Sequence, residues 1–239
     1  MHKRLLSIGS LIVLWTLLAY VIGNDIILPT PLDVTRRFIE LVKTGVFYES
    51  IFMTFMRAHI AFVFSLGIGV GLALLCFKYE KVEEILSLWI KGLQTIPQIS
   101  FVIFLYFILN ARWCVYVVVI LMAFPIAYFN YLEGLRSIPK DYKDMIALTK
   151  HTTAYLVKKI YLPMCRPQFI STIKAALPLS LKVCVMSEVL IYTSTGIGKQ
   201  LSLAKSAIDM TSVFAWTLAF VGLVSFEMYI LNKKLKRLH

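Results

Sequence analysis

The sequence is dominated by long apolar runs, and their lengths constrain the fold more than any other feature. A helix needs about 20 residues to cross a hydrocarbon core about 30 Å thick. Backbone polar groups in lipid must be satisfied within the segment, which favours helices. The runs therefore predict an all-α membrane protein with about six transmembrane helices. They lie at about Leu5–Ile22, Met56–Phe77, Val82–Leu109, Val115–Tyr131, Phe169–Ile191 and Val213–Leu231.

The third apolar run is long and contains a proline, Pro97. Proline removes one backbone donor and clashes with the preceding helical turn. We therefore expect the run 82–109 to bend at Pro97, or to begin as a tilted helix at the membrane interface.

The composition supports a membrane protein and argues against a nucleic-acid partner. Apolar residues make up 59% of the chain and charged residues 16%, whereas soluble domains average about 25% charged residues. The net charge is +12, but the cations lie at the ends of the apolar runs, where lysine and arginine set membrane topology. The first expected partner is thus the lipid bilayer.

Cysteines and histidines do not form a metal or redox pattern. No two of the four cysteines are close enough for a C-x-x-C pair, so we interpret them as small apolar residues. The four histidines are equally scattered. These residues are Cys76, Cys114, Cys165, Cys184, His2, His59, His151 and His239.

The distribution of lysine and arginine places both termini in the cytoplasm. The first run follows Lys3 and Arg4, and it is interpreted as a retained anchor because it is too long for a signal peptide and no A-x-A site follows it. The segment between the fourth and fifth runs, residues 136–167, is rich in lysine and arginine and is therefore expected on the same side.

The segment between the first two runs, expected outside, contains a predicted short helix at about residues 30–45. Thr30 fits the N-cap, Pro31 the first helical position, and Gly45 the C-terminus. An apolar stripe that includes Val34 and Phe38 is typical of a helix that lies on the outer membrane surface.

The cytoplasmic segment 136–167 is expected to form two short amphipathic helices. Asp141 is a candidate cap for a helix that extends to about Thr149. Thr152 or Thr153 is a candidate cap for a second helix that stops at Pro163. Two exposed amphipathic helices need a partner surface.

This segment resembles the cytoplasmic loop of permease subunits of ATP-binding-cassette importers, within the nitrate, sulfonate and taurine type. That loop reads E-A-A-x-x-x-G, nine residues, then I-x-L-P. Ile160, Leu162 and Pro163 match at the expected distance. Asp144 stands for Glu and Lys150 for Gly. A lysine there costs about 1 kcal/mol at positive φ, so we expect the turn to shift toward His151 or to use another cap.

The resemblance covers nearly the whole chain. ILPTPLDV is similar to the family's L-P-S-P-x-x-V, IPQISF carries its third-span proline, and FPIAYFNYLEGLRSIP resembles its fourth span. Downstream, the family's G-L-R, A-E and G-L-G correspond here to Thr172-Ile173-Lys174, Ser187-Glu188 and Gly196-Ile197-Gly198.

The resemblance implies a mechanical role and a set of partners. It implies two separate ATPase subunits that bind ATP and Mg²⁺, a second permease that is a copy of this chain or a close relative, and an outer substrate-binding protein. It also implies the cytoplasmic membrane of a bacterium as the location. The segment 136–167 would dock on the ATPase as a coupling helix. The residues assigned to this contact are Asp144, Met145, Ile146, Ala147, Lys150, His151, Thr152, Ile160, Leu162 and Pro163.

Motifs for catalysis or for a cofactor are missing from the sequence. It contains no G-x-x-x-x-G-K-[ST], H-E-x-x-H or G-x-S-x-G, and Gly196-Ile197-Gly198-Lys199 reproduces only part of a phosphate-binding loop. The chain is therefore expected to be a transport subunit rather than an enzyme. Gly67, Gly69 and Gly71 fall inside a run and predict close helix packing.

Ionisable residues inside the runs are hypotheses for function, because each costs about 2.5–3.5 kcal/mol at the membrane centre. Arg57 and Lys174 lie near span ends, where they are expected to snorkel. Lys182 lies in the middle of the fifth run, where it either pairs with a carboxylate or lines a wet path that favours an anion. The translocation-path candidates are Lys182, Glu188 and Pro97.

Two other functions fit an apolar chain of this kind. A secondary transporter driven by an ion gradient usually shows inverted repeats, and no internal repeat is evident here. A membrane assembly protein is the second alternative. The residues do not select the cargo, and the family includes carriers of sulfonates, taurine, nitrate, bicarbonate and vitamin precursors.

Overall fold

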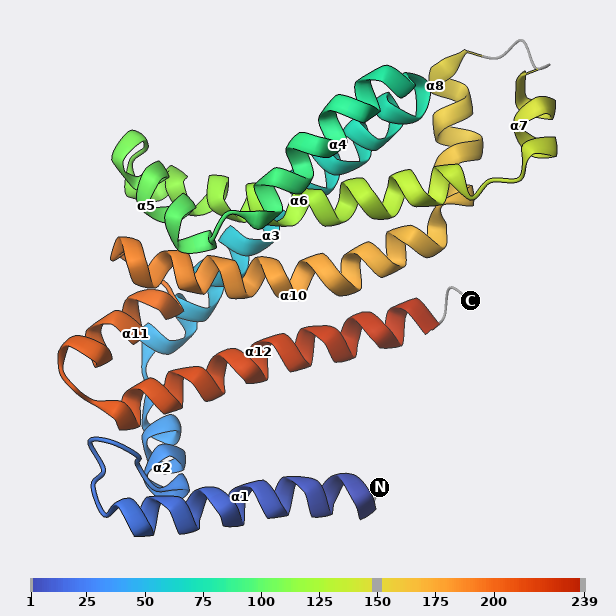
Figure 1. The fold of residues 1–239 in the computed structure, drawn as a ribbon. Helices are drawn as coiled ribbons and strands as arrows, with labels where there is room; N and C mark the ends of the chain where they lie inside the picture. Colours follow the sequence, from blue (N-terminus) through green and yellow to red (C-terminus); the bar gives the residue numbers. More distant parts are fainter. Residues whose placement is uncertain (1, 148–151, 237–239) are drawn as a thin grey trace.

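The computed structural model describes residues 2–147 and 152–236, and this part of the chain is helical with no strand. Figure 1 shows the helices as a long, open arrangement. The elements are α1 (His2–Ile22), α2 (Pro31–Val42), α3 (Gly45–Lys78), α4 (Glu80–Thr95), α5 (Gln98–Ile108), α6 (Ala111–Arg136), α7 (Lys140–Ala147), α8 (Thr153–Leu156), the π-helix η1 (Val157–Tyr161), α9 (Leu162–Met164), α10 (Arg166–Ile191), α11 (Ile197–Ser206) and α12 (Met210–Lys236).

Four helices, α3, α6, α10 and α12, are long and apolar enough to cross a membrane, and the pair α4 and α5 adds a fifth span if it is counted as one. The apolar part of α1, Gly9–Ile22, is shorter than these helices. Each predicted run coincides with a helix or, for the third, with a helix pair. The number of spans shown is four or five, so six stays a prediction.

The third run is broken where the sequence predicts it. α4 and α5 meet at an angle of 98°, and Ile96 and Pro97 both have extended ψ angles of 129° and 131°. A residue before proline disfavours the α conformation, which explains the extended Ile96. The prediction of a bend at Pro97 is confirmed.

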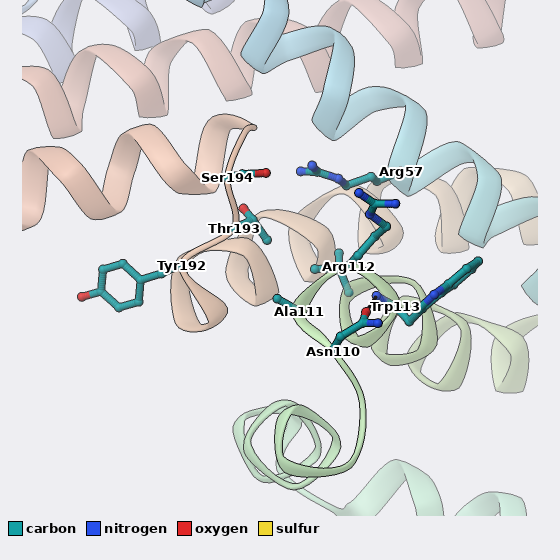
Figure 2. A pocket seen from close by; sticks show the side chains of 9 residues that line it. Arg57, Asn110, Ala111, Arg112, Trp113, Tyr192, Thr193 and Ser194 are labelled. Carbon is teal, nitrogen blue, oxygen red and sulfur yellow. Dashed lines mark hydrogen bonds between the residues drawn. The ribbon is translucent and has the colours of Figure 1, made fainter.

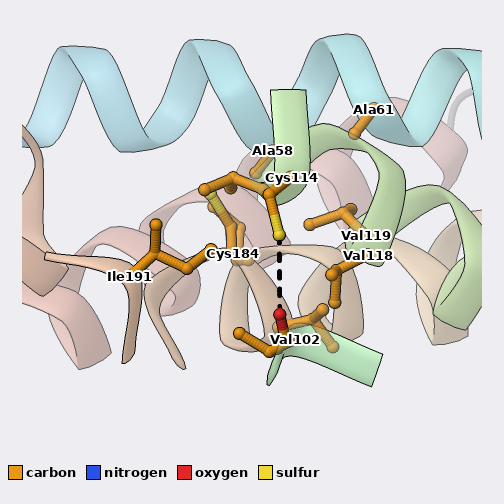
Figure 3. Packing of buried hydrophobic residues seen from close by; sticks show 11 residues of the cluster. Ala58, Ala61, Val102, Cys114, Val118, Val119, Cys184 and Ile191 are labelled. Carbon is orange, nitrogen blue, oxygen red and sulfur yellow. Dashed lines mark hydrogen bonds between the residues drawn. The ribbon is translucent and has the colours of Figure 1, made fainter. Parts of the chain in front are cut away.

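The core lies between α3, α6 and α10. Figure 3 shows Ala58 and Ala61 of α3 close to the small side chains of the other helices, where Cys114 and Cys184 take part in the packing. All four cysteines are free and buried, as expected for small apolar residues. Gly69 brings α3 against α6, because a Cβ there would lie 2.5 Å from the Cβ of Ala127.

The segment 30–45 is helical as predicted, with two differences. Thr30 caps α2 by accepting a hydrogen bond from the Asp33 amide, but Gly45 begins α3 rather than ending α2, because the last turn of α2 is already closed by Lys43. Val34 and Leu41 are buried with residues of α12 such as Trp216. The stripe therefore contacts protein rather than the membrane surface.

Candidate functional site

The segment 136–167 projects from one end of the molecule. Figure 1 shows α7 and α8 at the same end as the N-terminal end of α1 and the C-terminal end of α12. In α7, Met145 is 61% exposed and Tyr142 is also exposed. Exposed apolar side chains on a short helix at the end of a molecule are suited to a protein partner.

The first helix of the segment begins slightly earlier than expected. α7 starts at Lys140, so Asp141 lies in its first turn rather than at the cap, where its charge still favours the helix N-terminus. Asp144, Ile146 and Ala147 belong to α7. Thr149, Lys150 and His151 lie outside the described residues, and so does the prediction about the turn at Lys150.

The second half of the segment is held against the body of the protein. Thr152 caps α8, because its hydroxyl accepts a hydrogen bond from the Tyr155 amide at 3.4 Å. The Tyr161 ring packs edge-on against Phe77 of α3, with a centroid distance of 5.5 Å. A movement of this half would therefore reach α3 directly.

The predicted stop at Pro163 is wrong. The chain continues as η1 and α9 through Pro163 to Met164 and bends at Cys165. The helical stretch ends one residue after Pro163, at Met164. The preceding π-helical turn, Val157–Tyr161, is the irregularity that accompanies it. Ile160 is half-buried, whereas Leu162 and Pro163 are exposed.

An ion pair fixes α4 to the end of α6, beside this segment. Arg136, the last residue of α6, pairs with Glu83 of α4. The hydroxyl groups of Ser87 in α4 and Tyr128 in α6 lie 2.7 Å apart. The C-terminal end of α6, from which the segment 136–167 projects, is therefore joined to α4.

Glu188 is not exposed to any path in this structure. Its side chain is 0% exposed. Its carboxylate accepts hydrogen bonds from Arg57 Nη1 at 2.6 Å, from the Thr54 hydroxyl at 2.8 Å and from the Gly198 amide at 3.0 Å. The expectation that Arg57 snorkels is wrong, because a carboxylate is within reach inside the protein. We call Thr54, Arg57, Glu188 and Gly198 the Glu188 cluster.

The two glycines of Gly196-Ile197-Gly198 allow the backbone to pack closely against Glu188. Gly196 has a φ of 118°, and a Cβ there would lie 2.6 Å from the Glu188 carboxylate. A Cβ on Gly198 would lie 2.3 Å from the Cβ of Glu188. The chain after α10 thus folds tightly over a buried charge, and both glycines are needed for that approach.

A second, partly buried pair was missed by the sequence reasoning. His59 of α3 and Glu227 of α12 lie 2.6 Å apart between Nε2 and Oε1. Glu227 is an ionisable residue within the apolar run Val213–Leu231, and its position there could have marked it as a candidate for a buried partner. The signal did not identify His59, because the two residues meet only in the folded chain.

Lys182 projects from α10 away from the core. Its side chain is exposed, as are Ser171 and Ala175 at helical spacing on the same helix. Among the described residues, no carboxylate forms an ion pair with Lys182. Pro97, the other path candidate, is exposed at the break between α4 and α5.

Comparisons with known proteins give a consistent result. Residues 64–237 match the family described as binding-protein-dependent transport system inner membrane component. The chain is 29% identical over 225 residues to the formylaminopyrimidine transport permease protein ThiX of Halalkalibacterium halodurans, covering 90% of this chain and 87% of that one. It is 22% identical over 221 residues to the putative aliphatic sulfonates transport permease protein SsuC of Bacillus subtilis, covering 91% and 79%.

The fold is similar to that of a solved importer. A chain of the inward-facing MetNI methionine ABC transporter superposes with a TM-score of 0.71 at 14% identity, over 81% of this chain and 96% of that chain.

Proposed function

The chain belongs to the family of inner membrane components of binding-protein-dependent transport systems and is a permease subunit of the type I ATP-binding-cassette importers, and from this premise we propose how it works. Two copies form the translocation path for a small solute. Separate ATPase subunits bind ATP and Mg²⁺ and supply the energy. The chain gates the path and catalyses no reaction.

One observation carries the mechanical part of this proposal. In the segment 136–167, Tyr142 and Met145 of α7 are exposed, and the second half is anchored to α3 through Tyr161 and Phe77. A partner that holds α7 and changes position would push on α3 and on the adjoining end of α6. Coupling of this kind needs a stiff element with two placements rather than a reactive group.

Charge and the arrangement of the helix ends support the orientation that we propose. α7, α8, the N-terminal end of α1 and the C-terminal end of α12 lie at one end of the molecule (Figure 1). These helix ends and the segment 136–167 are also the parts of the sequence that are rich in lysine and arginine. Since these residues favour the cytoplasmic side, we place this end in the cytoplasm of a bacterial cell and the α2 and α11 end outside, where a substrate-binding protein delivers the solute.

We place the translocation path along the exposed face of α10. An unpaired lysine in lipid is costly, and such residues usually face a water-filled cavity or a partner. A second copy of this chain opposite Lys182 would enclose it in a wet path. Glu188 lies behind this face, in the interior of one copy.

The cargo is proposed by class alone. The relatives are named for formylaminopyrimidine, aliphatic sulfonates, riboflavin and bicarbonate. These names support a small solute that is either an anion such as a sulfonate or bicarbonate, or a vitamin precursor.

Site-directed cross-linking tests the coupling proposal. All native cysteines are buried, so a Met145→Cys variant adds a reactive thiol to α7. With single cysteines in the partner ATPase subunit, we expect a disulfide whose yield changes between ATP-bound and nucleotide-free complexes. Trp113→Cys, at the opposite end, is the matched control. Absence of any Met145→Cys product, or equal yields from both positions, would argue against the proposal.

A further inference from the structure

A polar cavity lies at the end of the molecule opposite α7. It measures about 540 Å³ and lies between the start of α6 and the α10–α11 loop, with Arg57 of α3 on a third side. Its volume falls in the range of small-molecule sites, about 300–1,000 Å³. None of its nine lining residues is acidic.

Two guanidinium groups line the cavity, those of Arg57 and Arg112. Arg57 is paired with Glu188 through Nη1 and bonds Thr195 through Nη1 and Nη2. Arg112 is exposed and, within the described part of the chain, has no hydrogen-bond or ion-pair partner. Figure 2 shows the Arg112 side chain directed toward that of Arg57. One positive charge at this cavity is therefore uncompensated.

The other polar groups around the cavity are also arranged as donors. The Asn110 Oδ1 accepts a hydrogen bond from the Trp113 amide at 3.1 Å, which leaves its NH₂ group available. The amides of Ala111 and Arg112 begin a helix of 26 residues, where they have no intrahelical partner. Across the cavity, Ser194 points toward Arg57 (Figure 2).

We propose that this cavity binds the oxyanion group of a small solute, namely a carboxylate, sulfonate or phosphate. Arg112 supplies the free charge and the bidentate geometry that such a group matches. Asn110 and Ser194 supply neutral donors, and the first turn of α6 adds amides. Identifying the bound solute with the cargo rests on the proposed function, whereas binding itself does not.

Thermal unfolding of the purified full chain in phosphatidylcholine nanodiscs tests the site, because a ligand that binds the folded protein raises the unfolding midpoint. Sodium ethanesulfonate, acetate and phosphate are titrated at constant ionic strength, with neutral dimethyl sulfone as the matched solute. We expect a saturable rise with one or more of the oxyanions and none with the sulfone. Arg112→Gln should raise the apparent Kd at least about tenfold, and Arg112→Lys should have a smaller effect.

The control is Arg36→Gln, because Arg36 is an exposed arginine on α2 that does not line the cavity. It should leave the apparent Kd unchanged. An unchanged Kd in Arg112→Gln, or no saturable response in the original chain, would overturn the site. Loss of the response in nanodiscs that contain phosphatidylglycerol would assign the cavity to a lipid headgroup and overturn the solute assignment. The assay uses neither ATP nor a partner, so its failure would leave the importer function standing.

Discussion

Arg57 Nη1 lies 2.6 Å from Glu188 Oε1, and this ion pair joins α3 to α10 where the following loop folds back. Arg57 is 16% exposed and Glu188 is 0% exposed. Two oppositely charged residues that are 131 positions apart in the chain thus form an ion pair inside the protein. The pair fixes the geometry of the end that carries the oxyanion cavity, since Arg57 also lines that cavity.

Removing one partner of this pair should be more harmful than removing both. Arg57→Met leaves a buried carboxylate without its counter-ion, which costs about 3–5 kcal/mol in comparable pairs. The double variant Arg57→Met with Glu188→Gln should recover part of this loss. Thermal unfolding in detergent measures the order of stability of the variants, with Arg36→Met as the exposed control. A double variant less stable than Arg57→Met would contradict the pairing as the source of the effect.

Three glycines of α3 that look alike in sequence should respond differently to alanine. A Cβ at Gly69 would lie 2.5 Å from Ala127 Cβ and 2.7 Å from the Phe124 carbonyl oxygen, whereas a Cβ at Gly67 or Gly71 would meet no atom of another part of the chain within 4 Å. Gly69→Ala should destabilise the protein by about 1–3 kcal/mol. Gly67→Ala and Gly71→Ala should be neutral or stabilising by up to about 1 kcal/mol. Equal unfolding midpoints for all three variants would refute the close contact of α3 with α6.

Asp209, between α11 and α12, should contribute a pH-dependent part of the stability. Burial acts to raise the pKa of this carboxyl group, but hydrogen bonds from Ser212 outweigh it, and the charge of Arg37 adds to them, so the pKa is lowered from its ordinary value of 3.8. A lowered pKa in the folded state stabilises the protein above the unfolded value. This contribution is lost as the pH falls below 3.8 through the folded value.

The comparison of Asp209→Asn with the unchanged chain isolates this contribution. The difference in unfolding midpoint should be constant from neutral pH down to about pH 5 and should shrink at lower pH. Asp33→Asn serves as a second acidic-group control on α2. A difference that grows as the pH falls would contradict the sign of the shift.

Lys182 should influence which solutes pass. If it lines the path between two copies, Lys182→Met should reduce transport of anionic solutes more than that of neutral ones. Lys174→Met, on the same helix but nearer its N-terminal end, is the control. Uptake by the complete importer with its binding protein is the measurement, and unchanged selectivity would remove Lys182 from the path.

The sequence was most informative about local features, although Asp141 is not the cap of α7 and Gly45 does not end α2. Apolar run length located the long helices, proline chemistry located the break at Ile96 and Pro97, and hydroxyl side chains identified the caps at Thr30 and Thr152. These features depend on a few neighbouring residues, so no knowledge of the tertiary structure was needed. The loop resemblance identified the family that the sequence match then showed.

The parts that sequence reasoning missed depend on contacts between distant segments. Arg57 was interpreted alone, and its partner Glu188 became evident only when α3 and α10 were placed together. One smaller error was local: Pro163 was expected to end a helix, but the helical stretch continues to Met164. The cavity around Arg112 was not foreseen, because its lining comes from three separate elements.

Uptake into proteoliposomes tests most directly whether this chain is moved by a separate ATPase. Vesicles contain the permease alone or with its ATPase subunits, and the binding protein is added outside with its solute. We predict uphill uptake only with the ATPase and internal ATP, unaffected by collapsing ion gradients, and loss of uptake in a Met145→Arg variant. Uphill uptake by the permease alone, driven by an ion gradient, would contradict the mechanism.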